Sequence, residues 1–154
     1  MTKRTMRRCF FAVIVYLMEA AVLVTAATAE VRTFMDDEGR EITVTQPFQR
    51  IISLYSAQIE ILYDLGASDQ LIGGQKTGYF PAPAAFLPQY DYNGDPEKII
   101  AAEPDLLLIR PFITRKAPDF VKAIENAGIT VVSLYPERFE DFDEYVRHLS
   151  ILTG

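Results

Sequence analysis

The sequence predicts an α/β fold in which helices flank a parallel sheet and a β-hairpin precedes it. Short apolar runs alternate with amphipathic helical patterns from residue 50 onward, as in repeated strand–helix units. Four consecutive apolar residues at 106–109 are typical of a parallel strand that is buried on both faces. Two β-rich runs, at 31–35 and 41–45, flank an acidic turn that contains glycine, and this pattern favours a hairpin.

The first strand–helix unit follows the hairpin. Residues 51–54 form a short apolar strand, and Ser56 is placed to cap the next helix. Gly66 ends that helix, because glycine readily adopts the left-handed conformation that closes a helix. We predict a second strand at 70–73, which its glycine weakens.

The rest of the chain continues the alternation, so right-handed crossovers place helices on both faces of the sheet. The remaining predicted elements are a long connection at 75–92 with one helical turn at 82–86, a helix from Asp95-Pro96 to Ala102, a helix at 119–127 ended by Gly128, a strand at 129–134 and a closing helix at 139–152.

The N-terminus has the pattern of a signal peptide. Basic residues precede an apolar run at 9–18, and Ala27-Thr28-Ala29 supplies a small-x-small cleavage site. We therefore expect residues 1–29 to be removed and residues 30–154 to form one exported domain. The alternative is an uncleaved anchor, but Glu19 interrupts the apolar stretch and disfavours a permanent membrane span.

Charge and cysteine content narrow the choice of partners. Residues 1–29 hold four of the 15 Lys+Arg and one of the 21 Asp+Glu, which leaves 11 against 20 and a net charge of −9. This balance argues against binding nucleic acid or anionic lipid, since both need basic patches. The one cysteine, Cys9, lies in the predicted signal peptide, so no disulfide is expected in the mature chain.

The candidate ligand-binding residues follow the predicted strands, because an open parallel sheet binds ligands at the carboxyl ends of its strands. They combine a guanidinium, an ammonium, hydroxyls, amides and aromatic rings, which suits a polar or anionic ligand with flat apolar parts. These candidates are Tyr55, Ser56, Gln58, Lys76, Thr77, Tyr79, Asn93 and Arg110, with Phe112 beside the last. The alternative is structural: Arg110 pairs with Glu137 or Asp119 on the surface, and Tyr55 and Tyr79 cover the edge of the core.

The sequence offers no catalytic constellation, and we predict that the protein is not an enzyme and uses no cofactor. The single histidine, His148, is spaced for the exposed or boundary side of the closing helix, where a structural role is expected. Nucleotide-binding glycine loops and the nucleophile elbow are absent from the sequence. With one histidine and no mature cysteine, a metal site built from side chains is not expected, so any iron must arrive already chelated.

Four stretches resemble the N-terminal lobe of the periplasmic binding proteins for iron-siderophores, haem and cobalamin, which serve ABC importers. In the family's order they are RTFMDDEGREITV at 32–44, RIISL at 50–54 with EILYDLGA at 60–67, EKIIAAEPDLLLI at 97–109, and AGITVV at 127–132. Together they span nearly all of residues 32–153.

The resemblance implies a two-lobed protein that holds its ligand between the lobes and hands it to a membrane permease. The candidate residues above then form the first lobe's half of the cleft, and the expected ligand is a ferric siderophore, haem or cobalamin. Glu97 aligns with the acidic residue through which such lobes dock onto arginines of the ABC permease. The alternative for Glu97 is a first-turn acid that favours the helix dipole.

The sequence departs from the family pattern at two places. Residues 54–57 stand where a Ser-Pro pair is common, so this loop is expected to differ in shape. The chain stops at 152–154, where the helix between the lobes begins in the family, so the second lobe is expected to be absent. Two further hypotheses therefore stay open: a docking module without ligand, and a truncated fragment without function.

Overall fold

The fold of the chain is given by a computed structural model, which describes residues 31–76 and 80–154. The predicted signal peptide and two candidate site residues, Thr77 and Tyr79, lie outside these ranges. Within them, every helix is too short or too polar to span a bilayer.

A parallel sheet forms the centre of the molecule, as predicted, and it has five strands. Its order is β5-β4-β3-β6-β7, and a separate antiparallel hairpin pairs β1 with β2. The strands are β1 (Arg32–Met35), β2 (Glu41–Val44), β3 (Ile51–Ser53), β4 (Leu71–Gln75), β5 (Gln89–Tyr90), β6 (Leu106–Ile109) and β7 (Thr130–Ser133).

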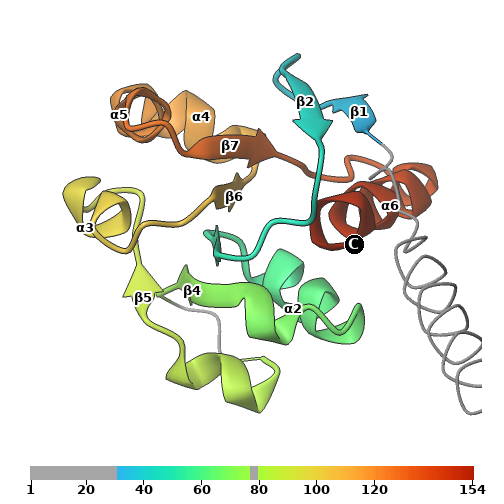
Figure 1. The fold of residues 1–154 in the computed structure, drawn as a ribbon, viewed down its shortest axis with the longest axis horizontal. Helices are drawn as coiled ribbons and strands as arrows, with labels where there is room; N and C mark the ends of the chain where they lie inside the picture. The colour runs from blue at the N-terminus through green and yellow to red at the C-terminus, as the bar shows by residue number, and fades with distance from the viewer. Residues whose placement is uncertain (1–30, 77–79) are drawn as a thin grey trace, which may run out of the picture.

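Helices cover both faces of the sheet (Figure 1). On β6, Leu106 and Leu108 point into the core on one face, while Leu107 and Ile109 point into the core on the other. The first face is covered by α2 (Ser56–Asp64), α6 (Phe142–Thr153) and the hairpin, and the second by α3 (Glu97–Ile100), α4 (Pro111–Lys116) and α5 (Pro118–Asn126). Short 3₁₀ turns occupy Ser68–Gln70, Ala82–Phe86 and Phe139–Asp141.

The hairpin is fastened to the exit of β7 by its own turn. The buried carboxylate of Asp36 accepts hydrogen bonds from the backbone N–H of Ser133 (3.0 Å) and from the N–H and Nε of Arg40 (2.9 and 2.8 Å). Asp37 continues this contact, because its N–H donates to the carbonyl of Ser133 (3.0 Å). The hairpin turn therefore lies beside the carboxyl end of the last strand.

Several element boundaries differ from the prediction. Ser56 does not cap α2: Tyr55 holds the cap position without a side-chain hydrogen bond, and Ser56 is the first helical residue. The second strand runs on through Gly73 and Gly74 to Gln75. The helix predicted to reach Ala102 ends at Ile100.

Two elements were not predicted, β5 and α4. The first has only two residues and continues the edge of the sheet beside β4. Pro111 opens α4, at a position where its missing N–H costs nothing.

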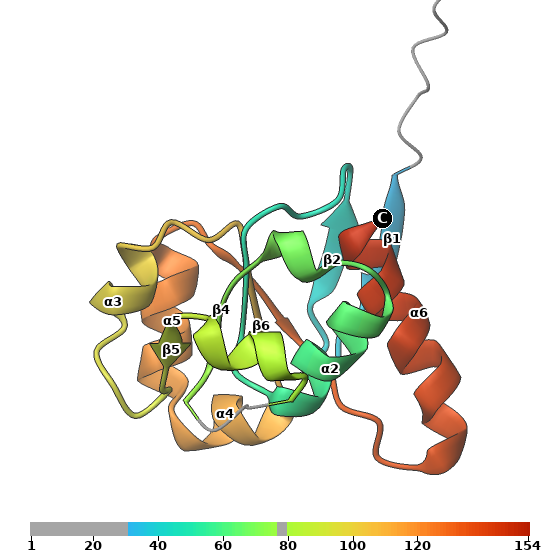
Figure 2. The ribbon, with the colours of Figure 1, turned by 90° about the horizontal axis from the view of Figure 1, so that it is seen from below.

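The sheet has one topological switch point, between β3 and β6. Strands β4 and β5 follow β3 on one side of it in the sheet. The chain then crosses back, and β6 and β7 lie on the other side of β3. Ligands of open α/β sheets bind outside the carboxyl ends of the strands at such a point. In Figure 2, α4 and the start of α6 lie toward the carboxyl edge, at the bottom, and the C-terminus lies toward the opposite edge.

Candidate ligand-binding site

The switch point brings together Tyr55 and Arg110, which follow the adjacent strands β3 and β6. The guanidinium carbon of Arg110 lies 5.0 Å from the centre of the Tyr55 ring. It lies 4.9 Å from the centre of the Phe112 ring on α4. Both distances are within the range of a cation–π contact. Two of the residues singled out in the sequence therefore meet, and Phe112 completes their contact.

Two further tyrosines extend this contact along the carboxyl edge. The Tyr135 ring lies 5.9 Å from the Tyr55 ring, centre to centre, and the Tyr92 ring meets Phe112 edge-on at 6.1 Å. We call Tyr55, Tyr92, Arg110, Phe112 and Tyr135 the arginine–aromatic cluster. It reaches from the exit of β5 to the exit of β7.

Tyr92 and Tyr135 were not identified from the sequence, because the pattern that links them to Tyr55 depends on where the strands end. Tyr55, Tyr92 and Tyr135 each stand two residues after the end of a strand, in β3, β5 and β7. Since all five strands are parallel, positions with the same offset from the strand end meet at the same edge. This offset was not visible before the strand ends and β5 were known.

The guanidinium of Arg110 is available for a ligand. It makes no hydrogen bond and no ion pair with any residue in the described ranges, so the predicted alternative partners Glu137 and Asp119 do not hold it there. The side chain is half-buried beside two rings, which contact the cation but leave its N–H donors without acceptors.

Gln58 does not lie on the ligand face. It is fully buried, and its amide N–H groups donate to the carbonyls of Ile109 and Leu134, both at 3.0 Å. Its amide oxygen accepts a hydrogen bond from Ser53 Oγ at 2.9 Å. Ile109 directly precedes Arg110, Leu134 directly precedes Tyr135, and Ser53 lies two residues before Tyr55. Gln58 therefore holds the backbone next to three residues of the cluster.

The other described candidates lie beside the cluster. Lys76 and Asn93 are exposed and line a hollow of about 430 Å³ at the ends of β4 and β5. The Asn93 amide already donates to Asp91 Oδ1 at 3.0 Å. Ser56 is half-buried at the start of α2. The structure thus divides the predicted candidates between the switch point and the β5 edge.

Glu97 is exposed at the start of α3. Its backbone N–H donates to Asp95 Oδ1 at 3.0 Å, although Pro96 and not Asp95 holds the cap position of this helix. Its carboxylate forms no ion pair within residues 31–76 and 80–154, so it is open to an external partner.

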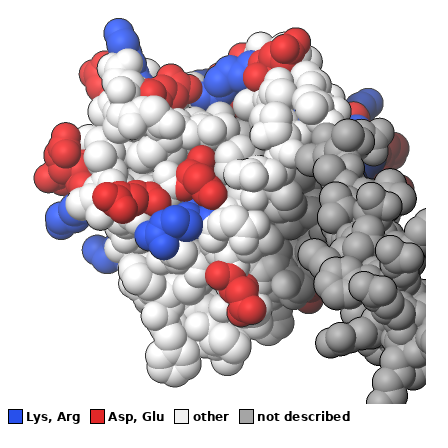
Figure 3. All heavy atoms as spheres, viewed as in Figure 1, with Lys and Arg blue, Asp and Glu red and all other residues white. Residues whose placement is uncertain are grey.

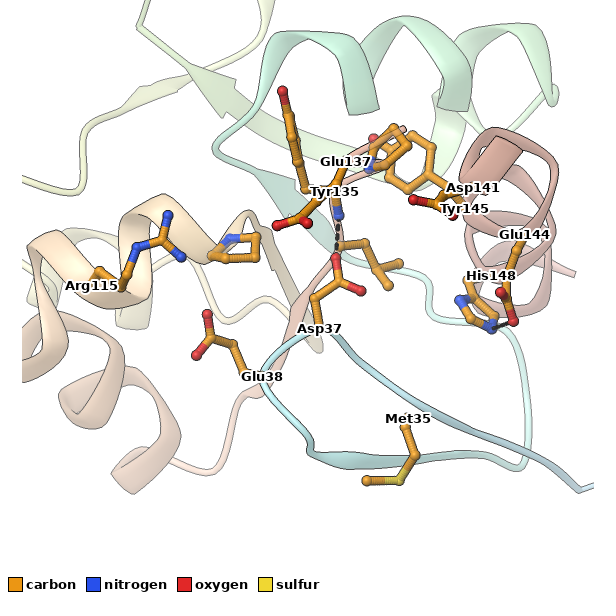
Figure 4. A pocket seen from close by; sticks show the side chains of 13 residues that line it. Met35, Asp37, Glu38, Arg115, Tyr135, Glu137, Asp141, Glu144, Tyr145 and His148 are labelled. Carbon is orange, nitrogen blue, oxygen red and sulfur yellow. Dashed lines mark hydrogen bonds and ion pairs between the residues drawn. The ribbon is translucent and has the colours of Figure 1, made fainter. Parts of the chain in front are cut away.

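A larger hollow of about 580 Å³ adjoins the cluster at Tyr135. Figure 4 shows Arg115 entering it from α4 on one side, Glu144 and His148 on α6 on the other, and Asp37 between them. Most of its charged residues are acidic, and we call it the acidic hollow. Its carboxylates are those of Asp37, Glu38, Glu137, Asp141 and Glu144.

The local environment sets the protonation of groups in the acidic hollow. Burial raises the pKa of Asp37, and repulsion from Glu137 adds to this, against the hydrogen bond that Asp37 accepts from the Tyr135 N–H at 2.6 Å. The hydrogen bond from Arg138 lowers the pKa of Asp141. Burial raises the pKa of Tyr145 far above its usual value, so this phenol stays neutral.

His148 is buried, contrary to the prediction of an exposed or boundary position. Its ring stacks on Phe34 of the hairpin, with centres 4.1 Å apart and planes 13° apart. Burial lowers its pKa, and the nearby Arg147 lowers it further. The histidine is therefore a core residue that joins α6 to the hairpin.

Metal binding by side chains finds no support in the described part of the chain, where no three His, Cys, Asp or Glu side chains are grouped to hold an ion. On the face shown in Figure 3, basic and acidic side chains are interspersed and form no continuous basic surface. The arrangement at the switch point instead suits a ligand with an anionic group and a flat face, held by the guanidinium and the rings.

Comparison with known proteins confirms the resemblance expected from the sequence, although no family model matches the chain. An uncharacterised ABC transporter substrate-binding lipoprotein of Bacillus subtilis (strain 168), YvrC, is 29% identical over 103 residues, which are 66% of this chain and 33% of that protein. The haem-binding protein HmuT superposes with a TM-score of 0.67 at 23% identity, covering 84% of this chain and 43% of HmuT. The periplasmic vitamin B12 binding protein BtuF of Vibrio cholerae gives a TM-score of 0.62 at 24% identity, covering 70% and 42%.

These similarities show that the chain has the fold of periplasmic solute-binding proteins. The chain spans less than half the length of each protein that it matches. BtuF is a periplasmic protein, YvrC is a lipoprotein, and all three are named as binding proteins.

Proposed function

We propose that this chain is the ligand-cradling lobe of the substrate-binding component of an ABC importer for an iron complex, haem or a corrinoid. The observation that carries the proposal is the arginine–aromatic cluster at the topological switch point. An unpaired guanidinium beside aromatic rings provides both an anion-binding group and a flat apolar surface. Catalysis is not part of this function: the lobe captures the ligand and presents it to a permease.

The named relatives support this proposal from a second direction. HmuT is a haem-binding protein and BtuF binds vitamin B12, and both share the fold. The signal-peptide pattern in residues 1–29 fits export to the compartment in which such proteins work.

The test is a titration of the purified chain with haem, a ferric siderophore and cobalamin. Binding is measured by the change in ligand absorbance or by isothermal titration calorimetry. At least one ligand is expected to bind, and Tyr55→Ala is expected to weaken it about tenfold, because one face of the contact is lost. Tyr63→Phe on α2, away from the carboxyl edge, is the matched control and should bind as the unaltered chain does. If none of the three ligands binds, the proposal of a ligand-binding lobe is wrong.

A second candidate function is docking to a membrane permease without a ligand, through Glu97. The exposed carboxylate without an ion pair favours it. Retention of the permease on the immobilised chain should be lost with Glu97→Gln and kept with Arg110→Gln. The nearby Glu103→Gln is the control for a general loss of negative charge. Retention that is indifferent to Glu97 would exclude this residue as the docking point.

A further inference from the structure

We propose that the acidic hollow is a binding site for an alkylammonium group, of the kind carried by a linear polyamine or by the amine arm of a larger ligand. The hollow adjoins the arginine–aromatic cluster at Tyr135, but its charge is of the opposite sign. It has no part in the function proposed above, so binding of an ammonium group there does not depend on binding of a chelate at the cluster.

Three carboxylates of the hollow lack a cationic partner. Asp37 and Glu38 in the hairpin turn, and Glu137 after β7, form no ion pair with another described residue. Burial raises the pKa of Asp37, and repulsion from Glu137 and Glu38 adds to this effect, so the three carboxylates lie within electrostatic range of one another. A cation placed among them removes this repulsion.

The other charged groups around the hollow do not neutralise these three. Asp141 pairs with Arg138 at 2.8 Å, and Glu144 pairs with Arg147 at 3.2 Å, so both acids already have a partner close by in the sequence. Arg115 enters from α4 and is the only lysine or arginine among the described lining residues (Figure 4). One guanidinium leaves the hollow with a net negative charge.

A buried hydroxyl without a partner borders the same space. Tyr145 lines the hollow from α6, is only 4% exposed, and its hydroxyl makes no hydrogen bond within residues 31–76 and 80–154. Figure 4 shows this side chain reaching from α6 toward Glu137. A buried hydroxyl that lacks a partner destabilises the fold, and an N–H donor of a bound cation would supply that partner.

The arrangement suits an organic cation rather than a metal ion. In the described part of the chain, no three acidic, histidine or cysteine side chains are grouped closely enough to hold a metal. An alkylammonium group has three N–H donors, and the amines of a polyamine are spaced along a flexible chain that reaches separate carboxylates. Met35, Leu134 and Pro136 offer apolar contacts to its methylene groups, and the Tyr135 ring offers a cation–π contact. The volume of about 580 Å³ is in the range of small-molecule sites.

The experiment titrates the full chain with spermidine, a linear polyamine, in isothermal titration calorimetry at physiological ionic strength. Triacetylated spermidine, which keeps the backbone but has no charge, is the control ligand. The unaltered chain is expected to bind spermidine and not the triacetylated form, because the carboxylates attract only a cation.

Two double variants that remove the same charge separate a site from general attraction to an acidic chain. Asp37→Asn with Glu137→Gln should weaken spermidine binding by about tenfold or more. Asparagine at the first position keeps an acceptor for the Tyr135 N–H, so the fold is expected to persist. Glu60→Gln with Asp64→Asn, both exposed on α2, should leave the affinity unchanged. Glu38→Gln, which alters one exposed carboxylate of the hollow, should weaken binding even if the first double variant is unstable.

Tyr145→Phe tests the buried hydroxyl by itself. The substitution should weaken spermidine binding by about threefold without lowering the free energy of unfolding, since the hydroxyl has no partner in the described chain to lose. Unchanged affinity would show that the hydroxyl does not contact the cation.

A ferric trihydroxamate with a terminal ammonium, compared with its N-acetylated form, distinguishes the two sources of the cation. If the ammonium belongs to a chelate, the charged form binds more tightly and spermidine competes with it. If a free amine is the ligand, spermidine binds and the two forms of the chelate do not differ. Equal spermidine affinity in the two double variants, or equal binding of triacetylated spermidine, overturns the ammonium site and leaves the proposed chelate-binding function untouched.

Discussion

At the scale of single residues, Gln58 supports three separate strand ends with one amide. It bonds to Ser53, Ile109 and Leu134, which belong to or directly follow β3, β6 and β7. Its position after the first strand suggested a ligand contact. The packing of α2 on the sheet buries this side chain, so Gln58 has a structural role instead.

Gln58→Leu is expected to destabilise the chain by about 2–3 kcal/mol, because buried carbonyls and a buried hydroxyl lose hydrogen-bond partners that no water replaces. Urea unfolding followed by circular dichroism measures the change. The exposed Gln46→Leu is the matched control and should shift the free energy of unfolding by less than about 0.5 kcal/mol. A shift below 1 kcal/mol for Gln58→Leu would show that its amide is not needed.

His148 makes stability depend on pH. Its pKa is lowered in the folded chain, chiefly by burial, so the unfolded chain takes up the proton first. The stability is therefore complete above the ordinary histidine pKa of about 6.5 and falls as the pH drops below it. Arg147 donates to His148 Nε2 at 3.1 Å, and this hydrogen bond is lost on protonation, while Glu144 at 3.8 Å offsets part of the cost.

His148→Phe is expected to flatten this dependence, because it removes the titrating group and keeps an aromatic ring against Phe34. The free energy of unfolding measured at pH 8, 7, 6 and 5 tests the prediction. The exposed Asp143→Asn on α6 serves as a control. An equally steep fall between pH 7 and 5 in His148→Phe would assign the effect to other groups.

At the scale of elements, the hairpin depends on Asp36. Its carboxylate is almost fully buried and holds both the turn and the exit of β7. Asp36→Ala is expected to cost about 3 kcal/mol, since the Ser133 N–H and the Arg40 guanidinium lose a charged acceptor. Faster amide exchange in residues 31–45 should accompany the loss.

Glu38→Ala, in the same turn but exposed, is the comparison for Asp36→Ala and should change the free energy of unfolding by less than about 0.5 kcal/mol. If the two substitutions have similar small effects, the hairpin is held by its apolar side chains alone. Phe34, Ile42 and Val44 are the buried apolar residues that would then carry it.

The two glycines of β4, Gly73 and Gly74, are required by the close packing of neighbouring elements on this strand. The sequence suggested that glycine weakens this strand. In the folded chain, a Cβ at Gly73 would overlap the Tyr90 ring, and one at Gly74 would stand 2.7 Å from Ile59 Cδ1. Both glycines therefore let a helix and the edge strand approach β4 closely.

At the scale of the whole molecule, the order of the strands creates the candidate site. Strands β3 and β6 are separated in sequence by two other strands, yet they are neighbours in the sheet. This places Tyr55 beside Arg110, and parallel pairing brings Tyr92 and Tyr135 to the same edge. A cluster of this kind has no local signature, because its members come from four separate loops.

The sequence by itself determined the α/β class, the hairpin, the apolar strand at 106–109 and the presence of Tyr55 and Arg110 after strands. These features depend on local periodicity and on turn residues, which act over a few positions. Only the tertiary structure decided that Gln58 and His148 are buried and that Tyr92 and Tyr135 join the site. Burial and pairing depend on contacts between residues far apart in the chain, and no local pattern specifies them.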